Sequence, residues 1–232
     1  MDYEKKLFTG LKKEFPELKL EKLQDSRWGR LIHAKTENEE INSKDAFKVL
    51  CIGSWTLGLL TLESLISLEN EYPGKIRIIA LVTDDPLDPG AKISLKRRFW
   101  RYYSIDNRED FEWVIVHRAL KLNIPCYTGD VKCEGFHNIL KDWNPDAIVT
   151  AGFGQIIDKT VIEFPPYGIY NVHPADLKQG YGAGPQPWED MIGRKAKTTR
   201  LTIHKVSPEI DSGDVVGQSP PINIPFSKFL FN

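Results

Sequence analysis

Residues 47–85, FKVLCIGSWTLGLLTLESLISLENEYPGKIRIIALVTDD, decide the fold class. Two apolar runs, Phe47 to Gly53 and Lys75 to Asp85, flank a longer segment, Thr56 to Tyr72, whose apolar residues recur at helical spacing. A strand, a long helix and a second strand form the unit from which a parallel sheet with crossover helices is built. The stretch therefore predicts an α/β protein.

The same alternation continues beyond residue 85. Apolar runs predict strands at 124–129 and 146–152, and periodic segments predict helices at 109–123 and 134–144. Three more strands are predicted towards the C-terminus, at 168–174, 198–206 and 214–224. We therefore expect a Rossmann-like, open, mostly parallel twisted sheet with helices on both faces, whose ligand lies beyond the carboxyl ends of the strands.

The N-terminal segment, residues 1–45, differs in character from the rest. It is rich in Lys and Glu, and Leu7, Leu11, Phe15 and Leu18 fall at helical spacing, while Thr36 to Asp45 is almost wholly polar. We predict a helical extension and polar linker over 1–45, and a catalytic domain over 46–232.

The bulk composition limits the class of protein. The 232 residues are 41% hydrophobic and 27% charged, and no apolar run approaches the roughly 20 residues of a membrane span, which predicts a soluble protein. The N-terminus lacks the apolar core of a secretory signal, so we expect a cytoplasmic location. A net charge of -1 argues against an extended nucleic-acid surface.

Metal binding is not predicted. The three cysteines form an odd set that suits a reducing compartment. Cys126, Cys133 and His137 lack the paired spacing of a zinc site, and no fourth ligand is apparent.

Polar residues that could carry chemistry lie at the end of a predicted strand, in Asn171-Val172-His173-Pro174. Side chains two positions apart point to one face of a sheet, so the Asn171 amide and the His173 imidazole could bind one developing oxyanion. Asp211, in the turn 208–213, could stabilise a protonated His173 if the strands are neighbours. The alternatives are a structural histidine beside a turn-forming asparagine, and an aspartate that only forms a turn.

Two stretches together, Ala151 to Leu177 and His204 to Val216, resemble the 10-formyltetrahydrofolate-dependent formyltransferase family. That family includes glycinamide ribonucleotide, methionyl-tRNA and nucleotide-sugar formyltransferases, and its hallmark is Asn-x-His-Pro followed by an Asp-x-Gly turn. The resemblance implies 10-formyltetrahydrofolate as the donor. It also implies catalytic roles for Asn171, His173 and Asp211, which would polarise the formyl oxygen and relay a proton.

The resemblance further implies a folate pocket with two walls. Phe153, Gln155, Ile156 and Ile157 would form one wall, and Ser207, Pro208, Glu209 and Ile210 the other. Core packing is the alternative for Ile156 and Ile157.

The acceptor is expected to be a primary amine, favoured here as an amino sugar nucleotide. Residues 92–103, KISLKRRFWRYY, interleave cationic and aromatic side chains that suit a phosphate and a base. The candidate substrate-binding residues are Ser54, Lys92, Lys96, Arg97, Arg98, Trp100 and Tyr181.

Departures from the family pattern leave the acceptor open. The chain has Ala175-Asp176-Leu177-Lys178 where relatives commonly have Ser-Leu-Leu-Pro, and Trp55 stands where the purine enzyme has a small polar residue. The alternatives are a methionyl-tRNA formyltransferase-like enzyme, with nucleic acid less favoured as a partner, a formyltetrahydrofolate hydrolase, and a non-catalytic folate-binding module. A homodimer is also left open, and no membrane partner is expected.

Overall fold

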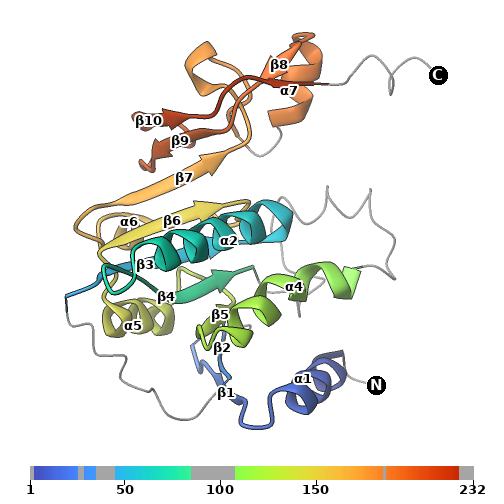
Figure 1. Ribbon diagram of the computed structural model, residues 1–232, viewed down its shortest axis with the longest axis vertical. Helices are drawn as coiled ribbons and strands as arrows, with labels where there is room; N and C mark the ends of the chain where they lie inside the picture. The colour runs from blue at the N-terminus through green and yellow to red at the C-terminus, as the bar shows by residue number, and fades with distance from the viewer. Residues whose placement is uncertain (1–2, 26–28, 35–44, 85–107, 185–186, 225–232) are drawn as a thin grey trace.

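A computed structural model describes residues 3–25, 29–34, 45–84, 108–184 and 187–224 (Figure 1). Five parallel strands form the centre of its large sheet, joined by helical crossovers. In spatial order they are β5 (Cys126–Thr128), β4 (Ile76–Thr83), β3 (Phe47–Gly53), β6 (Ala147–Ala151) and β7 (Ile169–His173).

Antiparallel strands extend this sheet at both edges. On one side β2 (Arg30–His33) pairs with β5, and β1 (Lys19–Lys22) pairs with β2. On the other side β9 (Thr202–Lys205) pairs with β7, and β10 (Val215–Gln218) pairs with β9. A separate short pair consists of β8 (Thr198–Thr199) and β11 (Ile222–Asn223).

Helices cover both faces of the parallel strands. α1 (Tyr3–Glu14), α2 (Trp55–Glu71) and α4 (Arg108–Lys121) contribute to one face, and α5 (Glu134–Trp143) and α6 (Lys159–Ile162) to the other. After β7 come a short 3-10 helix, Leu177–Gln179, and α7 (Pro187–Gly193). The predicted fold class is confirmed. Among the described helices, none is both long and apolar enough to cross a membrane.

The central strand β3 explains why its sequence is a continuous apolar run. Val49 and Cys51 point into the layer under α2 and α4, whereas Leu50 and Ile52 point into the layer under α5. Each fully buried Leu or Ile side chain stabilises the fold by roughly 1.5–3 kcal/mol relative to an exposed one. Burial also raises the pKa of the Cys51 thiol to about 12, so this group stays protonated and inert.

The N-terminal extension holds more than the predicted helix. β1 and β2 were not predicted, and β2 continues the main sheet, with Ile32 fully buried. The carboxylate of Asp25 also accepts a hydrogen bond from the Gly135 N–H at the start of α5. The predicted domain division at residue 45 stays a prediction.

Candidate active site

Asn171 and His173 lie on one face of β7, towards the carboxyl end of the strand. β7 is paired on one side with β6 and on the other with antiparallel β9. In that register Asn171 lies opposite His204, and His173 lies opposite Thr202. The alternation predicted from Asn171-Val172-His173 is confirmed, and it directs both polar side chains to the same place.

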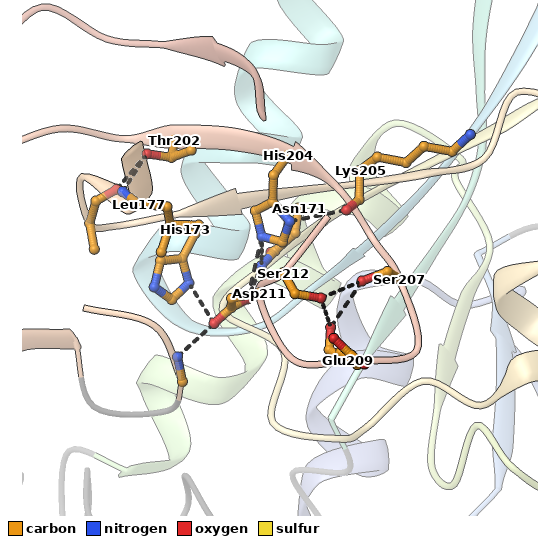
Figure 2. A network of polar contacts seen from close by, with 12 residues as sticks. Asn171, His173, Leu177, Thr202, His204, Lys205, Ser207, Glu209, Asp211 and Ser212 are labelled. Carbon is orange, nitrogen blue, oxygen red and sulfur yellow. Dashed lines mark hydrogen bonds and ion pairs between the residues drawn. The ribbon is translucent and has the colours of Figure 1, made fainter. Parts of the chain in front are cut away.

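Asp211 reaches this place through the turn between β9 and β10. Hydrogen bonds join the hydroxyls of Ser207 and Ser212 and tie each to the Glu209 carbonyl (Figure 2). Asp211 itself has a φ of 51°, in the left-handed region. Gly213 crosses so close to the strand that an added Cβ would lie 1.7 Å from the Lys205 carbonyl oxygen. A residue with a side chain therefore cannot fit there without moving the turn.

The three predicted catalytic side chains converge. Nδ2 of Asn171 donates to Oδ1 of Asp211 over 3.3 Å, and Nδ1 of His173 lies 3.5 Å from Oδ2 of the same carboxylate (Figure 2). The His173 and Asp211 side chains are only 8% and 10% exposed. Their catalytic roles stay predictions, but the proximity on which those roles depend is present.

His204, which was not predicted as a site residue, is a fourth member of the cluster. Its Nε2 lies 3.3 Å from Oδ1 of Asp211 and 3.1 Å from Nδ2 of Asn171. Its Nδ1 donates to the Lys205 carbonyl over 3.1 Å. A neutral His204 ring thus accepts from Asn171, whereas a protonated ring donates to Asp211.

The carboxylate of Asp211 is held in its charged form. Burial by itself raises its pKa, but the hydrogen bond from His204, the charge of His173 and the Gly184 N–H outweigh burial and lower it. The Gly184 N–H donates to Oδ2 over 2.7 Å. Asp211 is therefore an anion at neutral pH that can stabilise a positive imidazole.

A backbone carbonyl fixes the orientation of the His173 ring. Nε2 of His173 lies 2.6 Å from the Gly182 oxygen, and because a carbonyl only accepts, Nε2 carries the proton. Gly182 is in turn held through its own N–H by the Asp190 carboxylate over 2.7 Å. This contact leaves Nδ1 as the ring nitrogen that faces Asp211.

The first predicted folate wall divides into buried and exposed side chains. Phe153 and Ile157 pack against the core, as the packing alternative for Ile157 anticipated, whereas Ile156 is 63% exposed. The side-chain amide of Gln155 is hydrogen-bonded within the protein. Its Nε2 donates to Asp84 Oδ1 and to the Gly129 carbonyl, and its Oε1 accepts from the Val131 N–H.

Asp84, at the end of β4, anchors this wall. It is buried, and it accepts hydrogen bonds from the Gly154 N–H and from the Ser54 hydroxyl, which also contacts Thr83. Ser54, a predicted substrate-binding residue, thus has its hydroxyl committed to a buried network. Its substrate role stays a prediction.

The second predicted wall is the turn that carries Asp211. Pro208, Glu209 and Ile210 are exposed, with Ile210 at 62%, while Ser207 is half-buried and bonded within the turn. Each predicted wall thus has one exposed isoleucine side chain, Ile156 in the first wall and Ile210 in the second.

Tyr181, a predicted substrate-binding residue, makes its contacts within the protein. Its hydroxyl donates to the Thr198 carbonyl, and Arg194 lies over its ring. The described residues contain no group of three or more candidate metal ligands. The predicted acceptor-binding residues Lys92, Lys96, Arg97, Arg98 and Trp100 lie outside the described residues.

Residues 130–224 match the formyl transferase family, and this segment contains all four residues of the cluster. The resemblance drawn from the Asn171 and Asp211 motifs is confirmed. The chain is 42% identical over 88 residues to a methionyl-tRNA formyltransferase from Syntrophus aciditrophicus (strain SB), covering 38% of this chain and 28% of that protein. It is 29% identical over 171 residues to another from Orientia tsutsugamushi (strain Boryong), covering 73% and 48%.

The fold also matches that of solved structures. Phosphoribosylglycinamide formyltransferase from Bacillus halodurans superposes with a TM-score of 0.54 at 24% identity, over 76% of this chain and 80% of that one. The chain matches less than half of the length of the two methionyl-tRNA formyltransferases.

Proposed function

We propose that this chain, whose residues 130–224 match the formyl transferase family, transfers a formyl group from 10-formyltetrahydrofolate to a primary amine. The observation that carries the proposal is the convergence of Asn171, His173 and Asp211 at the end of β7. A binding-only module has no need of an amide, an imidazole and an ionised carboxylate aimed at one point.

The donor would bring an activated formyl group attached to a flat heteroaromatic system. The described residues fit such a molecule, because Ile156 and Ile210 expose apolar side chains on the two predicted walls. Apolar side chains combined with a few placed polar groups are typical of sites for small heteroaromatic ligands. Asp84 and Gln155 would hold the first wall in place.

The chemistry follows from the orientation of His173. With Nε2 bonded to Gly182, a protonated ring has its second N–H on Nδ1, beside Asp211, and its positive charge stabilises the formyl oxygen as this oxygen becomes negative during attack by the amine. Asn171 supplies an N–H from the same face of β7. Asp211 stabilises the positive ring and, through a water molecule, relays the proton that the attacking amine loses to N10 of the folate, so that the C–N10 bond breaks and tetrahydrofolate leaves as the new amide forms.

His204 adds control over Asn171 within the same proposal. While His204 is neutral, its Nε2 accepts one N–H of Asn171. Once His204 is protonated it donates to Asp211 instead, and that Asn171 N–H becomes available to the formyl oxygen.

The acceptor is a narrower question. Similarity to two methionyl-tRNA formyltransferases favours methionyl-tRNA, the alternative acceptor. The amino sugar nucleotide rests on residues 92–103, which lie outside the described residues. Each relative is longer than the segment that this chain matches. Contacts with tRNA that are made elsewhere in the relative therefore cannot be assigned to this chain.

An acceptor panel tests the proposal. The protein is mixed with 10-formyltetrahydrofolate and, separately, with methionyl-tRNA, amino sugar nucleotides, glycinamide ribonucleotide or no amine, and tetrahydrofolate release is followed by absorbance. Amine-dependent release with a formylated product supports the transferase. Equal release without any amine would indicate the hydrolase, and binding without release would indicate the non-catalytic module.

A further inference from the structure

The segment that departs from the family pattern, Ala175-Asp176-Leu177-Lys178, carries a buried charge. Asp176 lies two residues after Pro174, and it is only 4% exposed. A buried carboxylate is costly unless it is paired and hydrogen-bonded. Its partners therefore show what it is for.

Asp176 is paired with residues of the neighbouring hairpin. Its Oδ1 accepts from Nε2 of Gln218 over 2.8 Å, and its Oδ2 lies 3.4 Å from Nε of Arg200. Arg200 is itself fixed, because Nη1 donates to the Ser219 carbonyl over 2.6 Å. The carboxylate thus links the chain after β7 to the beginning and end of the β9–β10 hairpin.

Thr202 completes the attachment. Its hydroxyl donates to the Ala175 carbonyl over 2.5 Å and accepts from the Leu177 N–H and from Nε2 of Gln218. Thr202 also pairs with His173 in the sheet register (Figure 2). Ala175 and Leu177, the two neighbours of Asp176 in the chain, are therefore both hydrogen-bonded to Thr202, the residue that lies opposite His173 in the sheet.

The turn so fixed forms the support for Gly182. An added Cβ on Gly182 would lie 2.4 Å from Cβ of Ala175, so the two residues are in close contact. Gly182 has a φ of 77°, a conformation suited to glycine, and its carbonyl accepts from Nε2 of His173. A shift of Ala175 would therefore be transmitted to the carbonyl that orients the ring.

We propose that Asp176, held by Arg200 and Gln218, is a positioning residue that sets the orientation of His173 through Ala175 and the Gly182 carbonyl. The proposal rests on the proposed formyl transfer for its kinetic consequence. It does not rest on that activity for its structural consequence, which is the hydrogen bond at Nε2 of His173.

Asp176→Asn is the first test, because it keeps the shape and one acceptor but removes the charge that faces Arg200. We expect kcat for formyl transfer to fall about tenfold or more while the KM of the folate donor stays unchanged. The imidazole nitrogen resonances of His173, measured by NMR with ¹⁵N-histidine-labelled protein, should shift. Asp142→Asn, at an exposed aspartate on α5, is the matched control and should change neither quantity.

Arg200→Leu approaches the same link from its partly exposed side, where loss of folding is a smaller risk. It should shift the His173 resonances in the same way, and the double variant should lose no more activity than the worse single variant, since both changes break one link. Unchanged His173 resonances in both folded single variants would overturn the positioning role, even if wild-type transfer is observed. Shifted resonances without wild-type transfer would support the role and refute the proposed function.

Discussion

Nε2 of His204 lies 3.3 Å from Oδ1 of Asp211, so this carboxylate is shared between two imidazole rings, His204 on one side and His173 on the other. Both histidines are buried, and His204 is only 2% exposed. Asp211 is thereby fixed on both oxygens, with Gly184 bonded to Oδ2 as well. A carboxylate held in this way cannot rotate when substrate binds, which suits a group that must stabilise a developing charge.

Replacing His204 should therefore impair catalysis without any change to the three family residues. In His204→Leu, Asp211 loses the partner of Oδ1, and Asn171 loses one acceptor. We expect kcat for formyl transfer to fall about tenfold or more, because the reacting geometry loosens. The matched control is Ile203→Val, at the exposed neighbour on β9, which should leave kcat unchanged. Equal kcat values for the two variants would show that His204 has no part in positioning Asp211.

The pH dependence of stability should reveal the contacts of Asp211. Its pKa is lower in the folded protein than the value of about 3.9 expected in an unfolded chain. The ionised group therefore stabilises the fold above about pH 4, and this contribution is lost as the pH falls through the lower folded value. Urea unfolding of wild type and Asp211→Asn at pH 6 and pH 3 should show a stability difference at pH 6 that shrinks at pH 3. A difference that grows on acidification contradicts the assignment.

Gln155 should matter for stability more than for direct contact with folate. In Gln155→Glu, an oxygen replaces the Nε2 that donates to Asp84 and to the Gly129 carbonyl, so acceptors face acceptors in a partly buried place. We expect the free energy of unfolding to fall by about 3 kcal/mol, measured by urea denaturation. Glu163→Gln, which breaks only an exposed pair with Lys159, should cost about 0.5 kcal/mol or less. A loss as small as the control's would mean that the Gln155 contacts do not hold the wall.

Gly213 should be needed for the position of Asp211. In Gly213→Ala the new Cβ would meet the Lys205 carbonyl oxygen, so the turn must move and carry Asp211 with it. Formyl transfer should drop about a hundredfold, as measured by initial rates. Gly217→Ala, on the adjacent strand with nothing within 4 Å of the added Cβ, should retain the wild-type rate. Retention of the rate in both variants would show that the turn is not needed.

The strands of the sheet were predictable where the chain is buried on both faces. The run predicted at 47–53 is β3 itself, because every second residue enters a different core layer. β1, with the sequence KLEK, was missed because it is a charged edge strand whose stability comes from pairing with β2. The strand predicted at 214–224 breaks into β10 and β11 around Pro220 and Pro221, which cannot donate hydrogen bonds to a ladder.

The site was predictable only in part, because some of its contacts depend on how two strands pair. Asn171, His173 and Asp211 follow from a motif, but their contacts with His204 follow from the antiparallel register of β7 and β9. A local sequence pattern does not state that register. The sequence around His204 gave no signal, because an apolar–polar alternation over Thr202-Ile203-His204-Lys205 predicts a buried Ile203, whereas the structure exposes Ile203 and buries Thr202 and His204.

The catalytic role of His173 is tested most directly by the rate of transfer from 10-formyltetrahydrofolate to a productive amine, compared between wild type and His173→Gln. Glutamine keeps a polar side chain at the end of β7 but cannot carry the positive charge that Asp211 stabilises. We predict a loss of about a hundredfold or more in kcat, with unchanged affinity for the folate donor. A His173→Gln protein that transfers the formyl group at the wild-type rate would contradict the proposed catalytic role of His173.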